Sequence, residues 1–79
     1  MASRPEPEFQ IAIEHLQTAD FLLKEKKAKK LARAEGRYII NETMHALFWM
    51  CDKSWKQVRR RLKKHALDHL VDIYLEKDK

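Results

Sequence analysis

The sequence predicts an all-α fold, a small helical bundle of about three helices, from its lack of turn residues and the spacing of its apolar residues. The chain has 79 residues with one glycine and two prolines, and both prolines precede residue 8. A sheet of this size needs more turn residues than the chain provides. After residue 8, apolar residues recur at three- and four-residue steps, which is the spacing of one helix face. We therefore expect helices and no sheet.

The first helix is expected to begin near Glu8, after a disordered lead formed by residues 1–7. Pro5 and Pro7 each disfavour the α conformation of the residue before them. Residues 8–79 are expected to form a single helical domain, because a chain this short supports only one core. The expected apolar stripe of the first helix, widened by two neighbours, consists of Phe9, Ala12, Ile13, Leu16, Ala19 and Leu23 with Phe21 and Leu22.

Residues 24–37 are rich in lysine, arginine and alanine, so this segment is expected to be helical and mostly solvated. Two alternatives remain open for its start. A turn near residues 26–29 separates it from the first helix, which we favour, or one helix continues until Gly36 forms a C-terminal cap.

The next helix has Ile40, Met44, Leu47 and Cys51 on one line, and we expect it to be the most buried. Ser54 can cap a further helix, predicted over residues 54–75. Its expected apolar line consists of Trp55, Val58, Leu62, Ala66, Leu70 and Ile73. Three helices of this length expose more apolar surface than they cover, so our hypothesis is that a homodimer completes the core.

Composition restricts the class of protein. The single cysteine excludes an internal disulfide, which favours the reducing cytosol. No stretch approaches the roughly 20 apolar residues of a membrane span. We therefore expect a soluble, cytoplasmic protein that does not act at a membrane. The net charge of +5 favours acidic partners.

The sharpest feature is a run of seven basic residues within positions 53–64 that contains no acidic residue. On a continuous helix, Arg60 and Lys63 point in the direction that Leu67 and Val71 occupy further on, so one face changes from charged to apolar near Leu67. This predicts a charged half that contacts the phosphates of a polyanion, with Trp55 stacked on a base or sugar. The alternative is that the charges only solvate the helix while Trp55 lies in the core.

A second basic segment has seven lysines and arginines against two glutamates within residues 24–37. Two basic segments make nucleic acid a more credible partner than one segment would, and their relative position in space is the most informative observation. The residues predicted to bind nucleic acid or an acidic partner are Lys53, Lys56, Arg59, Arg60, Lys63, Lys64, Lys27 and Lys30.

Two functions follow from this charge. The leading one is a small regulatory protein that binds nucleic acid through the helix around residues 54–66. The alternative is a protein-interaction module or inhibitor that docks a basic face onto an acidic or nucleic-acid-binding surface of a larger complex. In that case Phe48, Trp49, Trp55 and Tyr74 are candidate anchors, provided that they are exposed.

We expect no enzyme, metal or cofactor. His65 and His69 stand four residues apart, but Cys51 is the only thiol and no paired ligand motif accompanies the histidines. Arg60 and His65 are separated by four residues, and this spacing resembles the motif of HEPN-type ribonucleases, which are also small helical proteins. That resemblance covers six residues and implies Arg60 and His65 as catalytic groups. Because the lysine-rich surroundings fit phosphate binding equally well, we assign no catalytic residue.

Overall fold

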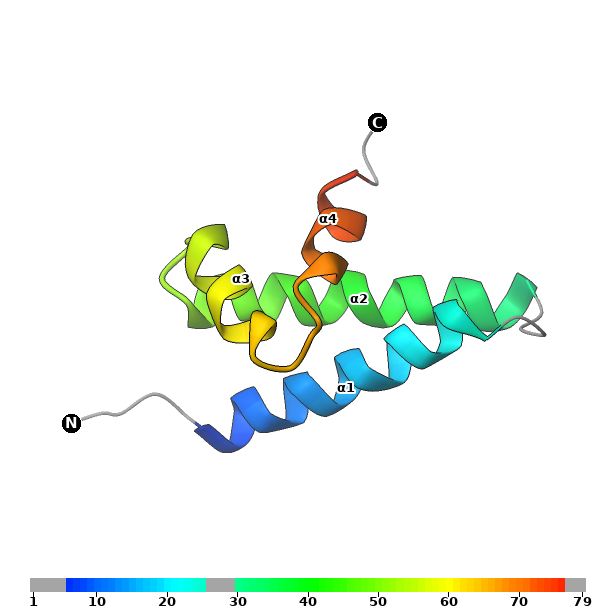
Figure 1. Ribbon diagram of the computed structural model, residues 1–79, viewed down its shortest axis with the longest axis horizontal. Coiled ribbons are helices and arrows are strands. Elements are labelled where there is room, and N and C mark those ends of the chain that lie inside the picture. Colours follow the sequence, from blue (N-terminus) through cyan, green and yellow to red (C-terminus); the bar gives the residue numbers. More distant parts are fainter. Residues whose placement is uncertain (1–5, 26–29, 77–79) are drawn as a thin grey trace.

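The computed structural model describes residues 6–25 and 30–76 and shows four helices (Figure 1). They are α1 (Glu6–Lys24), α2 (Lys30–Met50), α3 (Trp55–Lys63) and α4 (His69–Glu76). These residues contain no strand, so the prediction of an all-α fold is confirmed. The described part has four helices rather than about three, because the long helix expected over residues 54–75 is two short ones.

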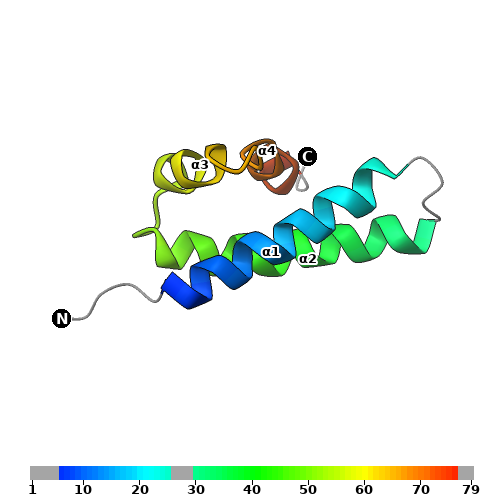
Figure 2. The ribbon, with the colours of Figure 1, turned by 60° about the horizontal axis from the view of Figure 1, so that its bottom comes forward.

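The helices form two layers (Figure 2). The long helices α1 and α2 lie side by side in one layer, and α3 and α4 lie together on one side of that pair. α1 begins at Glu6, two residues earlier than expected, with Pro7 in its first turn, where proline's missing N–H costs no helical hydrogen bond. α1 ends at Lys24 and α2 begins at Lys30, which agrees with a turn near residues 26–29. Those four residues themselves lie outside the described part.

The core lies between the two layers. Ile40, Met44 and Leu47 on α2, and Cys51 just after its end, are at most 1% exposed. α1 buries five apolar residues, so the expectation that α2 is the most buried helix is not confirmed. The other core residues come from α1, α3, α4 and the segment between the last two: Phe9, Ala12, Ile13, Leu16, Ala19, Val58, Leu62, Leu67, Leu70 and Val71. Three expected core residues are instead exposed: Phe21 at 64%, Ile73 at 37%, and Ala66.

Gly36 lies inside α2 rather than at its end, and it is buried against α1. A Cβ atom at this position would stand 3.4 Å from the carbonyl oxygen of Ala19 and equally near the side chains of Leu22 and Leu23. This position therefore has room for a methyl group but for no larger side chain between the two long helices, and Gly36 does not act as a helix cap.

The break between α3 and α4 is a helix-ending motif built without glycine. The N–H of Leu67 donates to the carbonyl of Leu62 at 3.0 Å, and the N–H of Ala66 donates to Lys63 at 3.1 Å. This is the pattern of a Schellman motif, which requires a left-handed backbone conformation at the residue before Leu67. That residue, Ala66, has φ 58°. Leu62 and Leu67 are both buried, which supplies the apolar contact that usually accompanies the motif.

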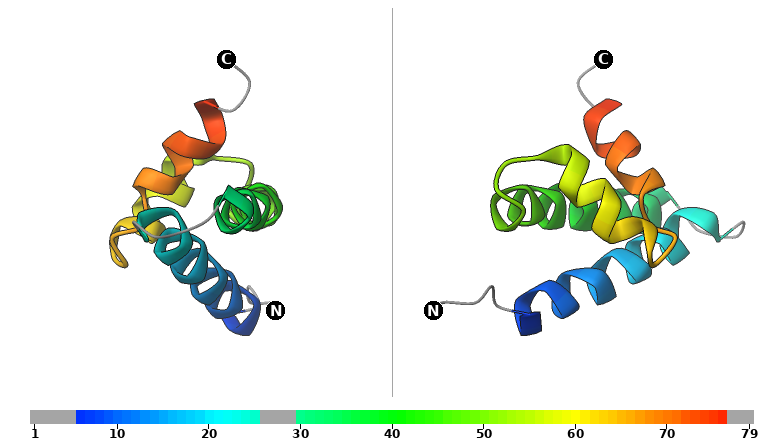
Figure 3. Two further views of the ribbon diagram at one scale, coloured as in Figure 1. Left: turned by 90° about the vertical axis from the view of Figure 1, so that its right-hand side faces the viewer. Right: turned by 60° about the vertical axis from the view of Figure 1, so that its left-hand side comes forward.

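This break corrects the predicted change of a helical face at Leu67. Arg60 and Lys63 belong to α3, whereas Val71 belongs to α4, and Leu67 lies in the connection between them. The two helices run in different directions (Figure 3, right). The charged and apolar residues are therefore not successive parts of one face, and Ala66, expected on the apolar line, is exposed.

Candidate functional site

Helix α3 is placed by its cap and by two buried side chains. The Oγ of Ser54 accepts a hydrogen bond from the N–H of Gln57 at 3.3 Å, which confirms the predicted cap. Val58 and Leu62, one turn apart, point into the core with exposures of 1% and 0%. Because these residues fix the inner side of the helix, the opposite side must face solvent.

Four basic residues occupy that solvent side. Lys56, Arg60, Lys63 and Lys64 are all exposed, and we call them the outer basic face. Their spacing of four, three and one places them on one side of α3 and its C-terminal end. Within the described part of the chain, none of the four forms an ion pair or a side-chain hydrogen bond. Their charges are therefore available to a partner.

The other basic residues of the run contact the protein itself. The Nη2 of Arg59 donates to Oδ1 of Asp72 on α4 at 2.7 Å. This hydrogen bond is the main reason that the pKa of Asp72 is lowered and that of Arg59 raised. The Arg61 guanidinium lies 3.8 Å from the ring centroid of Phe9, and the Lys53 ammonium lies 4.4 Å from that of Trp49. Arg59 and Arg61 therefore join α3 to α4 and α1.

The second basic segment lies at the other end of the molecule. Lys24 ends α1 and Lys30 begins α2, whereas α3 lies over the C-terminal part of α2 (Figure 1). α2 has 21 residues, which at 1.5 Å per residue separates its ends by about 30 Å. The described part of the second segment therefore does not join the outer basic face. Lys27, also predicted to bind, lies outside the described residues.

The aromatic side chains differ in exposure from what the sequence indicated. Trp55, the predicted stacking residue, is only partly exposed and packs between Phe48 and Tyr74, with ring centroids 4.8 and 5.4 Å away. Trp49 is instead 56% exposed. Trp49 lies on the side of α2 opposite the buried residues Met44 and Leu47, so the helical spacing of the sequence already indicated that it would be exposed.

The histidines do not form the pair that their spacing suggested. His65 lies in the turn after α3, whereas His69 begins α4, so the two do not share a helix. Nε2 of His69 lies 2.8 Å from Oδ1 of Asp20 on α1. In the described ranges, 6–25 and 30–76, no three His, Cys, Asp or Glu residues are grouped as metal ligands would be. Among the described residues, no hydrogen bond or ion pair joins His65 to Arg60.

Asp20 joins α1 to α4 and also contacts Lys24, whose Nζ is 3.1 Å from its Oδ2. Burial acts to raise the pKa of Asp20, but the hydrogen bonds and positive charges of His69 and Lys24 outweigh it, so the pKa is lowered. This carboxylate is therefore a structural anchor for α4.

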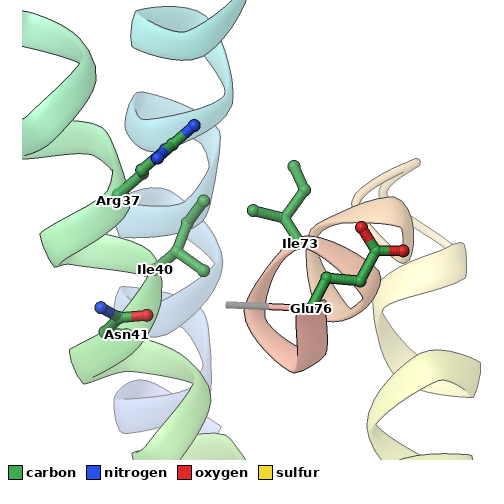
Figure 4. A pocket seen from close by; sticks show the side chains of 5 residues that line it. All are labelled: Arg37, Ile40, Asn41, Ile73 and Glu76. Atoms are coloured by element: carbon green, nitrogen blue, oxygen red, sulfur yellow. The ribbon is translucent and has the colours of Figure 1, made fainter. Parts of the chain in front are cut away.

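An open groove of about 410 Å³ lies between α2 and α4 (Figure 4). Arg37, Ile40 and Asn41 line it from α2, and Ile73 and Glu76 line it from α4. Its lining has one positive and one negative side chain and no serine, cysteine or histidine that would act as a nucleophile or base. The groove therefore offers less to a functional argument than the outer basic face does.

Comparisons of the chain with protein-family models, with curated proteins and with solved structures found no match. None of the helices in the described part is both long and apolar enough to cross a membrane.

Proposed function

We propose that the protein is a small regulatory binding module that contacts the phosphates of nucleic acid through the outer basic face. One observation supports this proposal above the others: four exposed cations share one side of α3, and no carboxylate in the described part of the chain neutralises them. A surface that only solvated its helix would gain from interspersed acidic residues, because mixed charges reduce repulsion between neighbours. α3 has none.

Charge reversal tests the proposal. Arg60→Glu and Lys63→Glu replace exposed side chains, so the variants should keep the parent's circular dichroism and thermal midpoint. Each should weaken binding of a fluorescently labelled oligonucleotide in an anisotropy titration, because a phosphate contact becomes a repulsion. Arg33→Glu is the matched control, because it makes the same change of charge at an exposed position on α2, away from α3. Equal loss of affinity in all three variants would contradict a site on α3.

The alternative partner is an acidic protein surface. The same four cations would then meet carboxylates, and Trp49 is the exposed aromatic anchor that such an interface needs. The titration separates the two functions: no binding of any oligonucleotide at low salt would favour the protein partner. Neither function requires a catalytic group, a metal or a cofactor.

We also propose that the chain forms a homodimer through the side of α1 and α2 that α3 and α4 leave uncovered (Figure 3, left). Two adjoining hollows lie along this side. Their lining includes apolar Ile11, Ile39 and Met50 with polar Glu8, His15 and Glu42, but no lysine or arginine. Two copies of a chain with charge +5 therefore meet here with less repulsion than at α3.

A dimer has a thermal midpoint that rises with protein concentration, because association and folding are then coupled. Ile11→Asp should remove that dependence, since the new charge would be buried at the interface. Leu31→Asp is the control, because Leu31 is 80% exposed and does not line either hollow. A parent midpoint that is constant over about a hundredfold dilution would exclude the dimer.

A further inference from the structure

We infer that the nucleic acid bound by this protein is single-stranded and that an unpaired base stacks on Trp49. The inference rests on the proposed function and names the class of nucleic acid for the same site. It starts from an indole that is 56% exposed at the end of α2, next to the turn that leads into α3.

The turn between α2 and α3 places a cation against this ring. The N–H of Lys53 donates to the carbonyl of Phe48 at 2.8 Å, which closes the end of α2, and both Asp52 and Lys53 have φ 58°. The Lys53 ammonium then lies 4.4 Å from the Trp49 ring centroid. An aromatic face and a phosphate-binding cation are therefore adjacent.

The chain continues from Lys53 into α3, the helix that carries the outer basic face. Lys56 follows three residues later in the first turn of α3, and Arg60 and Lys63 extend the same side of that helix. Phe48, next to Trp49 at 6.4 Å between ring centroids, packs under Trp55, the first residue of α3. Trp49 thereby lies at the end of α2 from which the chain enters α3.

This combination suits a single strand better than a duplex. Proteins that bind single strands pair a basic path along the backbone with aromatic side chains on which bases stack. In a duplex the bases are stacked on one another and paired, so an exposed indole has no base face to contact. The outer basic face by itself serves either form, because phosphates are common to both.

The experiment compares Trp49→Ala with the parent on three labelled probes of equal length: oligo(dT), oligo(U) and a mixed-sequence DNA duplex. Trp49→Ala should weaken single-strand binding by about 5- to 150-fold, the range for loss of one stacked base. It should leave duplex affinity unchanged. Phe21→Ala is the matched control, because Phe21 is an aromatic residue that is 64% exposed near the end of α1, away from α3. The two single-stranded probes distinguish a DNA partner from an RNA partner.

Tryptophan fluorescence provides a second readout that a change in stability would not reproduce. Binding of oligo(dT) or oligo(U) should quench part of the parent's emission. The Trp49→Phe variant should lose this quenching, because its remaining tryptophan, Trp55, is packed between Phe48 and Tyr74. That variant should keep most of its single-strand affinity, since phenylalanine also stacks.

The outcomes separate this inference from the proposed function. Oligonucleotide binding that depends on Arg60 but is equally strong for the duplex, or is unchanged in Trp49→Ala, would overturn the inference and leave the proposed function standing. Absence of binding to every probe at low salt would overturn both.

Discussion

Ala66→Gly is the substitution that best tests the break between α3 and α4. Ala66 has φ 58°, and the left-handed conformation costs an L-residue about 1–2 kcal/mol. Glycine adopts it without that cost, but it loses more backbone entropy on folding, by about 0.5–1 kcal/mol relative to alanine. Ala66 is exposed, so little packing is lost. We expect the free energy of unfolding to rise by about 0.5–1 kcal/mol.

The sign of the change separates the two descriptions of this segment. If residues 54–75 formed one helix, Ala66 would be in its interior and the same substitution would cost about 1 kcal/mol. Urea denaturation followed by far-UV circular dichroism measures the difference, and Ala34→Gly is the matched control. Ala34 is exposed inside α2, so its replacement should lower stability by about 1 kcal/mol. Loss of stability in Ala66→Gly similar to that in Ala34→Gly would refute the break.

Substitutions at Leu47, Gly36 and Asp20 test the packing and the contact between α1 and α4. Leu47→Ala should lower the free energy of unfolding by about 2–5 kcal/mol, because Leu47 is fully buried, whereas Leu31→Ala at an exposed site should change it little. Gly36→Ala should raise it by up to about 1 kcal/mol and Gly36→Leu should lower it by about 1–3 kcal/mol, because only the larger side chain forces α1 away. The pKa of Asp20 is lowered from its ordinary 3.8, so the ionised carboxylate of Asp20 stabilises the fold above pH 3.8, and this stabilisation is lost as the pH falls further. Asp20→Asn should therefore lose less stability than the parent in denaturant titrations between neutral and acid pH.

The spacing of apolar residues was sufficient to predict the long helices and most of the core. Ile40, Met44 and Leu47 were placed correctly because a helix with one buried side repeats every 3.6 residues. The break at Ala66 was not predictable from its local signals, because neither glycine nor proline stands near it. It forms because the chain must turn for Leu67 and Val71 to enter the same core as Leu62.

The candidate site was predicted in part. The clustering of charge indicated Lys56, Arg60, Lys63 and Lys64, which are exposed together, but it could not show that Arg59 is bound to Asp72. That ion pair depends on the turn that brings α4 back beside α3. The choice of Trp55 over Trp49 as the stacking residue followed from its place within the basic run.

The helical phase of Trp49 relative to the buried line of α2 was the better guide to exposure. A residue opposite Met44 and Leu47 has no core to enter, whereas Trp55 begins a helix whose inner side lies on Phe48. Charge clustering therefore located the surface, but only the helical phase indicated which aromatic side chain is exposed on it.

The most direct measurement of the central claim is the salt dependence of nucleic-acid binding. Four phosphate contacts from the outer basic face predict that the logarithm of the binding constant falls with the logarithm of salt concentration with a slope of about −2.8 on a single strand. Affinity should then fall about 50-fold between 50 and 200 mM salt. Arg60→Glu and Lys63→Glu should each reduce the slope by about 0.7, whereas Arg33→Glu should leave it unchanged. A slope near zero, or one that Arg33→Glu reduces as much as the α3 variants do, would contradict phosphate binding by this face.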